Sequence, residues 1–395
     1  MIGRGRESPR KTRGRADRAF GPTSASLEAS RRSLLRWYRR HRRPLPWRKT
    51  SDPYRIWVSE VLLQQTPVTT ALRYYRSFLR RFPTLSLLAR APLRDVLKTW
   101  EGAGYYARAR LMRSAARVLL RKASGHWPRQ SDQLRTLPGF GPYMSCSLAA
   151  LAFGERVVAL DTNGRRVLSR LFLIRDPLTS RHTEVRLRDL GTALLGRASP
   201  RDFNEALMEL GQRICRPNQP RCSECPLART CLARQELPDP ALLPARRVRP
   251  RRPHVRASVA IIPWRGRVLV APRPPSGLLG GLYEFPGGKV QPGESPEEAV
   301  VREVREEVGV APACPPHLLG RLEHDYSHFH VSLHVFALPV RDARRASGVR
   351  RRWRWVTGEE LRRLPLPAAT RKMWPWVTEV LSAPPRPSPP ATCPG

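Results

Sequence analysis

Apolar positions in the first half of the chain recur with helical spacing. From residue 27 onward they fall every three or four positions among arginines, as at Leu34 and Tyr38. This spacing predicts amphipathic helices that each bury one face. The segment 52–68 is expected to begin at a capping aspartate and to end at Pro67. Further helices are expected at 70–82, 93–99 and 106–122, and after Asp161.

The pattern changes to an alternation of apolar and polar positions from Ala257. Residues 257–274 predict two strands that are joined by a turn at Arg265 and Gly266. Residues 287–310 are expected to form a glycine-containing loop followed by an acid-rich helix. Strands are also expected within 324–340 and 352–356.

These two patterns predict a mainly α N-terminal domain and an α/β C-terminal domain. A Pro/Arg-rich stretch separates them, and Arg-, Ser- or Pro-rich segments lie at both ends of the chain. The expected regions are a disordered basic arm over 1–26, a helical domain over 27–235, a linker over 236–256, an α/β domain over 257–380 and a disordered tail over 381–395.

The charge of the chain points to an anionic partner. The 395 residues include 72 basic and 32 acidic side chains, a net charge of +40, which favours nucleic acid. The longest uncharged stretch, 136–154, is interrupted by prolines and glycines, so a membrane partner is not expected. Seven cysteines, four of them clustered, argue for a metal site in a reducing compartment. We expect a monomer, located in the cytoplasm of a bacterium or in the mitochondrion or nucleus of a eukaryote.

A glycine-rich turn at 137–143 is the first candidate functional segment. Gly139 and Gly141 allow a sharp turn, and Pro142 suits the first turn of the helix that follows. Because backbone amides at a helix start bind anions, the turn is expected to hold a DNA phosphate. Asp161 follows the helix and either serves the same cleft or simply caps the next helix together with Asn163.

Four cysteines form the second candidate site. Their spacing is C-x6-C-x2-C-x5-C, which brings four thiolates within 17 residues and suits either zinc or an iron–sulfur cluster. The residues are Cys215, Cys222, Cys225 and Cys231.

The order of several motifs resembles that of MutY-type adenine DNA glycosylases of the helix-hairpin-helix (endonuclease III-like) superfamily. They are "LPWR", "SEVLLQQT", "GYYARAR", "LPGFGPY", "LDTN", "FNEALMELG" and the cysteine spacing. The resemblance covers about 30–233 and implies a [4Fe–4S] cluster rather than zinc. It also implies excision of adenine mispaired with 8-oxoguanine or guanine in double-stranded DNA, after base flipping.

The resemblance further implies roles for single residues. Glu60 is expected to protonate N7 of adenine from apolar surroundings, and Asp161 to stabilise the sugar cation. Tyr143 would lie near the sugar, and Asn163 would orient water and carboxylates. The remaining expected contacts are Arg48 and Glu205 around the adenine, and Gln65, Thr66 and Tyr105 in the duplex near 8-oxoguanine.

Residue 143 separates two reactions of this superfamily. Endonuclease III has a lysine there, because its lyase step needs an amine nucleophile, and it has glutamine in place of Glu60. Tyr143 and Glu60 therefore predict a glycosylase without lyase activity.

The C-terminal segment resembles the Nudix-like domain of the same family. A complete Nudix box runs from Gly288 to Val310, and in Nudix hydrolases its Glu303, Glu306 and Glu307 hold Mg²⁺ or Mn²⁺. Two alternatives are open: a domain that only reads 8-oxoguanine, through Ser327 and His328, or one that also hydrolyses 8-oxo-dGTP.

Overall fold

The computed structural model describes residues 22–245, 252–277, 279–326, 329–346 and 353–383. The chain divides into two compact units that interleave in the sequence. One unit combines Met1–Arg43 with Arg156–Arg246, and the other combines Pro44–Glu155 with Arg247–Gly395. No helix in the described ranges has the length and apolar character that a membrane crossing requires.

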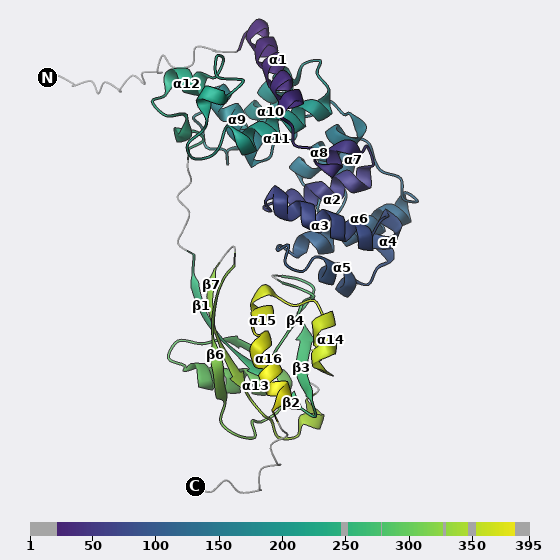
Figure 1. Cartoon of the computed structure of the whole chain (residues 1–395), viewed down its shortest axis with the longest axis vertical. Helices are drawn as coiled ribbons and strands as arrows, with labels where there is room; N and C mark the ends of the chain where they lie inside the picture. Colours follow the sequence, from purple (N-terminus) through teal and green to yellow (C-terminus); the bar gives the residue numbers. More distant parts are fainter. Residues whose placement is uncertain (1–21, 246–251, 278, 327–328, 347–352, 384–395) are drawn as a thin grey trace, which may run out of the picture. The chain divides into compact units, whose positions relative to one another are not determined.

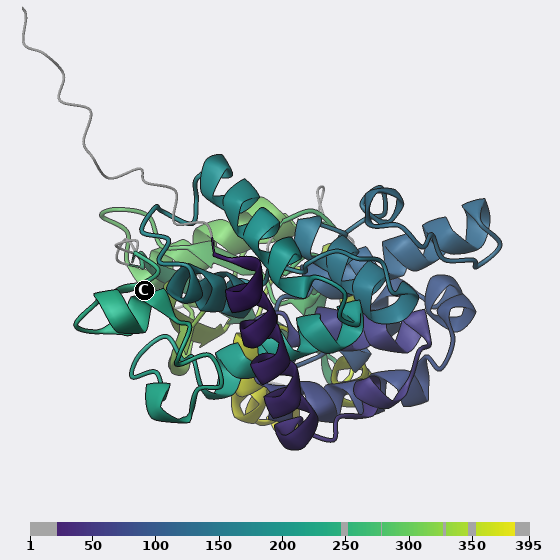
Figure 2. The same ribbon diagram turned by 90° about the horizontal axis from the view of Figure 1, so that it is seen from above.

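Helices from both ends of its sequence build the first unit. It contains α1 (Ser24–His41), α9 (Thr162–Leu171), α10 (Arg181–Leu195), α11 (Pro200–Arg213), α12 (Leu232–Glu236) and the 3-10 turns η2 (Cys222–Glu224) and η3 (Pro240–Leu242). Helix α1, dark purple in Figure 2, packs along α10 and α11. Leu34 and Tyr38 of α1 are fully buried in one core with Leu168, Phe203 and Leu207. The helical periodicity at these positions therefore marks a true core face.

The helices of the second unit come from residues 46–153. They are η1 (Pro46–Lys49), α2 (Pro53–Leu63), α3 (Val68–Arg81), α4 (Leu85–Arg90), α5 (Leu93–Thr99), α6 (Ala107–Lys122), α7 (Ser131–Leu134) and α8 (Pro142–Phe153). The expected helices at 70–82, 93–99 and 106–122 are confirmed within two residues. The expected end of α2 at Pro67 is wrong, because the helix stops at Leu63 and Gln65 has a left-handed backbone, with φ at +58°.

The same unit contains the α/β domain, drawn in green and yellow in Figure 1. Its strands are β1 (His254–Ile261), β2 (Pro263–Trp264), β3 (Arg267–Pro272), β4 (Tyr283–Glu284), β5 (Gly287–Lys289), β6 (His317–Asp325), β7 (His330–Ala337) and β8 (Arg354–Val356). Its helices are α13 (Pro296–Val308), α14 (Gly358–Arg363), α15 (Ala368–Lys372) and α16 (Trp374–Ser382), with a 3-10 turn η4 (Ala343–Arg345).

Two sheets make up this domain. One has the order β5-β1-β7-β6, with β1 parallel to β7, and the other joins β2, β3 and β4, with β8 on β3. Val300 and Val304 of α13 pack in one core with Ala260 and Phe336, whereas Met373 and Val377 contribute to a second core. The mixed sheet with helices on both sides confirms the expected α/β class.

The strand boundaries differ from the expected ones in two places. Strand β1 begins at His254, because its first residue already pairs with His330 of β7. The segment 324–340 is not one run of strand. It contains the end of β6 and all of β7, antiparallel strands joined by a turn in which the Tyr326 amide donates to the Phe329 carbonyl.

Candidate active site

Glu60 is a buried carboxyl held by two hydroxyl groups. It lies on α2, where its side chain is almost inaccessible. The Tyr143 hydroxyl donates to Glu60 Oε2 at 2.7 Å, and the Ser147 hydroxyl donates to the same oxygen at 2.6 Å. Tyr143 and Ser147 are four residues apart on α8, so they project from one face of that helix. The packing of α2 on α8 thus fixes a carboxyl that can give or take a proton.

The glycine turn between α7 and α8 is exposed to solvent, but one of its side chains is buried in the core beneath it. Gly139 has φ at +80°, and an added Cβ would lie 2.9 Å from Leu111 Cβ, so glycine is required there. Phe140 is buried and stacks on Trp57 with ring centroids 5.6 Å apart. Gly141 is the N-cap of α8 and Pro142 its first residue, as expected. The turn therefore presents a helix start to solvent on a rigid base, a geometry that suits a phosphate.

Arg108 joins the two loops that carry Gln65, Thr66 and Tyr105. Its guanidinium donates to the Val61 carbonyl at 2.7 Å and, on the other loop, to the Gly104 carbonyl at 3.2 Å. It also donates to the carbonyls of Leu62, Gln64 and Ala103 and to the Thr66 hydroxyl.

Both of these loops have strained backbones. Gln65 and Tyr105 have positive φ values of 58° and 48° although neither is glycine. The Tyr105 ring is 37% exposed and lies 5.3 Å from the Arg108 guanidinium. Tyr106 is buried instead, so of this tyrosine pair it is Tyr105 that is available to a partner. The structure thus brings the three residues expected to enter the duplex onto neighbouring loops of one unit.

Asp161 belongs to the other unit, where it caps α9. Its Oδ1 accepts a hydrogen bond from the backbone N–H of Gly164 at 2.6 Å. Its Oδ2 accepts one from the side-chain amide of Asn163, also at 2.6 Å. Burial raises the pKa of this carboxyl, although those two donors and the nearby Arg166 act in the opposite direction. The capping role is therefore confirmed, and it leaves the catalytic role as a prediction.

A hydrogen-bonded path connects Asp161 to the cysteine loop. Arg166 donates to Asn163 Oδ1 at 2.9 Å and to the Cys215 carbonyl at 2.8 Å. Helix α11 can approach Asn163 because residue 211 is glycine, where an added Cβ would lie 2.6 Å from Asn163 Cβ. Asn163 is thus held from two sides, which orients its amide toward Asp161.

The two residues expected around the adenine lie in different units. Glu205 of α11 is buried and accepts from the Tyr38 hydroxyl and from Arg201 Nε at 3.4 Å. Arg48 lies half-buried on η1 in the other unit. Each is described within its own unit, and their shared role stays a prediction.

The four cysteines line one cavity together with Arg170. Arg170 is buried and donates to Cys215 Sγ at 3.3 Å, to the Arg216 carbonyl at 2.7 Å and to the Pro217 carbonyl at 3.0 Å. It also donates to the Leu243 carbonyl at 2.8 Å, so the segment after α12 is fixed to the same core.

The donor set of this cavity fits an iron–sulfur cluster. Among the described residues, no three of the four thiols have their Sγ atoms within 4.8 Å of one another. Four thiolates on one zinc ion would lie about 3.8 Å apart, since a Zn–S bond is about 2.3 Å long. Four thiols around one cavity, with an N–H donor on one sulfur, are a donor set that an iron–sulfur cluster can use. Burial raises the pKa of the Cys225 thiol to about 12.

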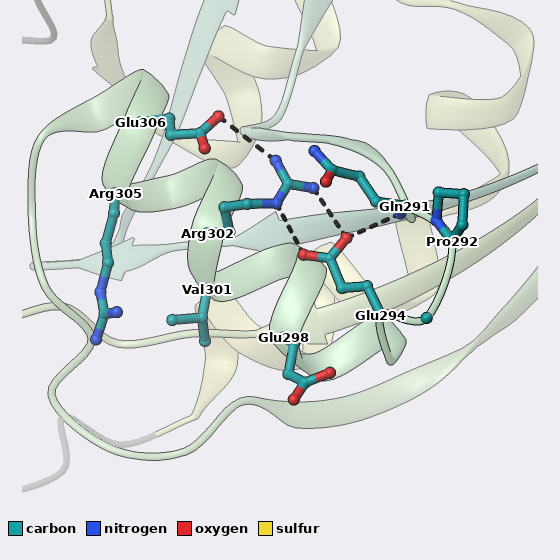
Figure 3. A pocket seen from close by; sticks show the side chains of 9 residues that line it. Gln291, Pro292, Glu294, Glu298, Val301, Arg302, Arg305 and Glu306 are labelled. Carbon is teal, nitrogen blue, oxygen red and sulfur yellow. Dashed lines mark hydrogen bonds and ion pairs between the residues drawn. The ribbon is translucent and has the colours of Figure 1, made fainter.

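The acids of the Nudix box bind an arginine. Arg302 donates to both oxygens of Glu294, at 2.7 and 3.0 Å, and to Glu303 at 2.9 Å and Glu306 at 3.4 Å, as Figure 3 shows in part. Glu307 instead accepts from the Gly287 amide at 3.2 Å. In the described part of the chain, these carboxylates do not form a group with all ligand atoms within 4.8 Å. The structure therefore does not bring Glu303, Glu306 and Glu307 together as a metal site.

Ser327 and His328 lie outside the described residues, so the expected contact with 8-oxoguanine stays a prediction. Sequence reasoning missed Ser147, Arg108 and Arg170. A signal existed for Ser147, because it follows Tyr143 by one helical turn on a helix that was expected. Arg108 and Arg170 bind backbone carbonyls, for which the sequence has no specific pattern.

Comparison with known proteins gives a family match for each half of the chain. Residues 58–192 match the HhH-GPD superfamily of base excision DNA repair proteins, and residues 258–376 match the NUDIX domain. The adenine DNA glycosylase of Homo sapiens is 32% identical over 89% of this chain and 74% of its own. The rat (Rattus norvegicus) adenine DNA glycosylase is 33% identical over 89% of this chain and 78% of its own. A thermostable thymine-DNA glycosylase superposes with a TM-score of 0.50 and 27% identity, over 55% of this chain and all of that structure.

The fold and the site together define a helix-hairpin-helix DNA N-glycosylase of base excision repair that is joined to a Nudix-like domain. The chain belongs to the adenine DNA glycosylase family. Because these relatives match across both domains, the alternative of a nucleotide hydrolase is not favoured.

Proposed function

We propose that this chain excises adenine paired with 8-oxoguanine or guanine. In this reaction the flipped adenine leaves as Glu60 protonates N7, and the Asp161 carboxylate faces the developing oxocarbenium ion. The observation that carries the proposal is the buried Glu60 carboxyl, which two hydroxyl donors fix on a single oxygen. Burial favours the protonated form of a carboxyl, while the two donors hold it in one orientation, and a general acid needs both a proton and a fixed position.

The reaction stops at the abasic site. A lyase step needs an amine that forms a Schiff base with the sugar, and position 143 carries a phenol. The Tyr143 hydroxyl also donates a hydrogen bond to Glu60, so it helps to position the acid. Asn163, which is bonded to Asp161, orients that carboxylate and the attacking water.

The surrounding loops bind the duplex. Gly139 and Gly141 contact the backbone phosphate, and Gln65, Thr66 and Tyr105 enter the stack beside the orphaned base. Arg48 and Glu205 contact the adenine, while Ser327 and His328 read 8-oxoguanine. The exposed Tyr105 ring beside a cation suits stacking on a base.

The four cysteines would hold a [4Fe–4S] cluster. Such a cluster would supply a rigid cross-link for residues 215–231 and a site for electron transfer. The chain's own contribution is the Arg170 guanidinium, which holds the carbonyls of the loop in place.

Strand cleavage tests the proposal. Purified protein is incubated with duplexes that contain A:8-oxoguanine, A:G or thymine glycol, and the products are resolved with and without hot alkali. Cleavage of the adenine strand only after alkali is the expected result. The Glu60→Gln variant should be inactive, and the exposed Glu28→Gln variant should match the wild type. Cleavage without alkali at full rate, or no adenine release, would contradict the proposal.

A further inference from the structure

A polar cluster lies on strands β1, β6 and β7 of the β5-β1-β7-β6 sheet, and it shares no residue with the candidate active site or with the cysteine cavity. His254 begins β1, His330 begins β7, and Glu323 lies near the end of β6. One ligand atom from each of the three lies within 4.8 Å of those of the other two. We propose that His254, Glu323 and His330 form a binding site for a divalent transition-metal ion of the zinc class.

The backbone places these three side chains together. His254 pairs with His330 across the parallel β1 and β7 strands, and Glu323 pairs with Ser332 across β6 and β7. Residues at paired positions, and residues two apart on one strand, share a face of the sheet. The site is thus built on rigid strands, which position metal ligands more accurately than loops do.

The surrounding contacts match those of metal-binding histidines. The His330 Nδ1 atom lies 3.0 Å from Asp325 Oδ1, and its Nε2 atom lies 2.6 Å from Glu323 Oε2. A carboxylate on Nδ1 selects the tautomer in which Nε2 is the ligand, an arrangement common in zinc sites. The Ser332 hydroxyl links the other two ligands, since it lies 2.6 Å from His254 Nε2 and donates to Glu323 at 2.8 Å.

The ligand chemistry selects the class of ion. Two imidazoles and one carboxylate suit zinc and its neighbours in the first transition series, while Mg²⁺ and Ca²⁺ prefer oxygen ligands. Glu323 and Asp325 bring two carboxylates to His330, and a divalent cation bound by that imidazole would offset their charge. Three protein ligands leave one tetrahedral position for water. The bound ion would join β1 to both β6 and β7.

The test measures metal uptake by the full-length protein. Zinc affinity is determined by competition with a chromogenic chelator, and cobalt is then added to record the visible spectrum. The variants His254→Ala and His330→Ala should lose the site. Asp325→Asn, which removes only the carboxylate on Nδ1, should weaken binding about 10- to 100-fold. His317→Ala is the matched control, because His317 is an exposed histidine at the other end of β6.

The cobalt spectrum separates this site from the cysteines. Binding at the histidines should give d–d bands without a thiolate-to-cobalt charge-transfer band, and the two histidine variants should lose those d–d bands. Equal zinc affinity in all variants would overturn the proposal and leave the cluster as a surface ion pair. A cobalt signal that consists only of thiolate charge transfer would overturn it too. Neither outcome would affect the proposed glycosylase activity, because the site shares no residue with it.

Discussion

At the scale of residues, the proposed acid Glu60 is held through one oxygen atom of its carboxyl group. Both hydroxyl donors point to Oε2, so the position of the carboxyl is set by α8 as much as by its own helix. Ser147 lies 87 residues from Glu60 in sequence, so only the packing of α2 on α8 brings its hydroxyl to the carboxyl. Glu60 itself could be predicted, because it is a single acid within an apolar helix.

Substitutions around Glu60 should separate acid catalysis by its carboxyl from the positioning of that carboxyl by Tyr143 and Ser147. Glu60→Gln should lower the single-turnover rate of adenine excision by about 100-fold or more, since general acid catalysis contributes that much. Tyr143→Phe and Ser147→Ala should each lower it about 10-fold, the effect of one lost hydrogen bond. Rates are measured by alkali-dependent cleavage at saturating enzyme, with DNA affinity followed in parallel. A Ser147→Ala rate equal to that of the wild type would contradict the role assigned to the hydroxyl.

The acid side of the pH profile should report on Asp161. Burial raises the pKa of this carboxyl, so it takes up a proton at a higher pH than an ordinary aspartate does, whose pKa is about 3.9. Because the role proposed for Asp161 needs its carboxylate form, the excision rate should fall on acidification with an apparent pKa above that value. Asn163→Ala should raise this pKa further, since it removes a donor to the charged form. A single-turnover pH series of both proteins gives the comparison.

The raised pKa of Asp161 also determines how this residue makes the stability of the fold depend on pH. A raised folded-state pKa means that the folded chain holds the proton more tightly than the unfolded chain. The contribution of Asp161 to the free energy of unfolding is therefore complete at a pH below its pKa in the unfolded chain. It is lost as the pH rises through the pKa that Asp161 has in the folded chain. Asp161 thus reduces stability at neutral pH, at the position where we propose that its carboxylate acts.

At the scale of elements, Arg108 is the residue on which two loops depend. Its bonds to the carbonyls of Val61, Leu62 and Gln64 explain why α2 ends earlier than its sequence suggests. An arginine of α6 takes those carbonyls, and the backbone then turns at Gln65 into the left-handed region. Periodicity and the position of Pro67 could not reveal this, because the competing donor is more than 40 residues away in sequence.

Replacement of Arg108 should loosen both loops together. Arg108→Met leaves several buried carbonyls without a donor, and we expect it to lower the free energy of unfolding by about 3 kcal/mol. Excision at A:8-oxoguanine should fall more than non-specific DNA binding, because Gln65 and Tyr105 lose their fixed backbones. Urea unfolding and single-turnover rates measure the two effects. Arg117→Met, an exposed arginine of the same helix, should change neither.

Strand boundaries show the same limit of sequence reasoning. Alternation predicted strands within 324–340, and β7 lies there. It could not reveal the turn after Asp325, because histidine and aromatic residues continue the pattern through that position. The helix after the glycine loop was predictable, since Ser295 and Glu298 form a capping box at its start.

At the scale of the whole molecule, charge should control DNA binding. A net charge of +40 means that many arginines are available to replace counterions along the duplex. The affinity for DNA without a lesion should fall by about a thousandfold or more between 50 and 200 mM salt. Fluorescence anisotropy across a salt series checks this, with single-turnover excision at saturating enzyme as the control that should change little. A flat salt dependence would show that this charge does not contact the duplex.

The interleaving of the two units also has a consequence for synthesis. Helix α1 is synthesised before its partners α10 and α11, which end at Leu195 and Arg213. Until then its apolar face, with Leu34 and Tyr38, has no core to join. The nascent chain must therefore expose this face while the helices of residues 46–153 are made, which is an opportunity for chaperones to bind. Truncation before Arg213 would leave α1 permanently in that state.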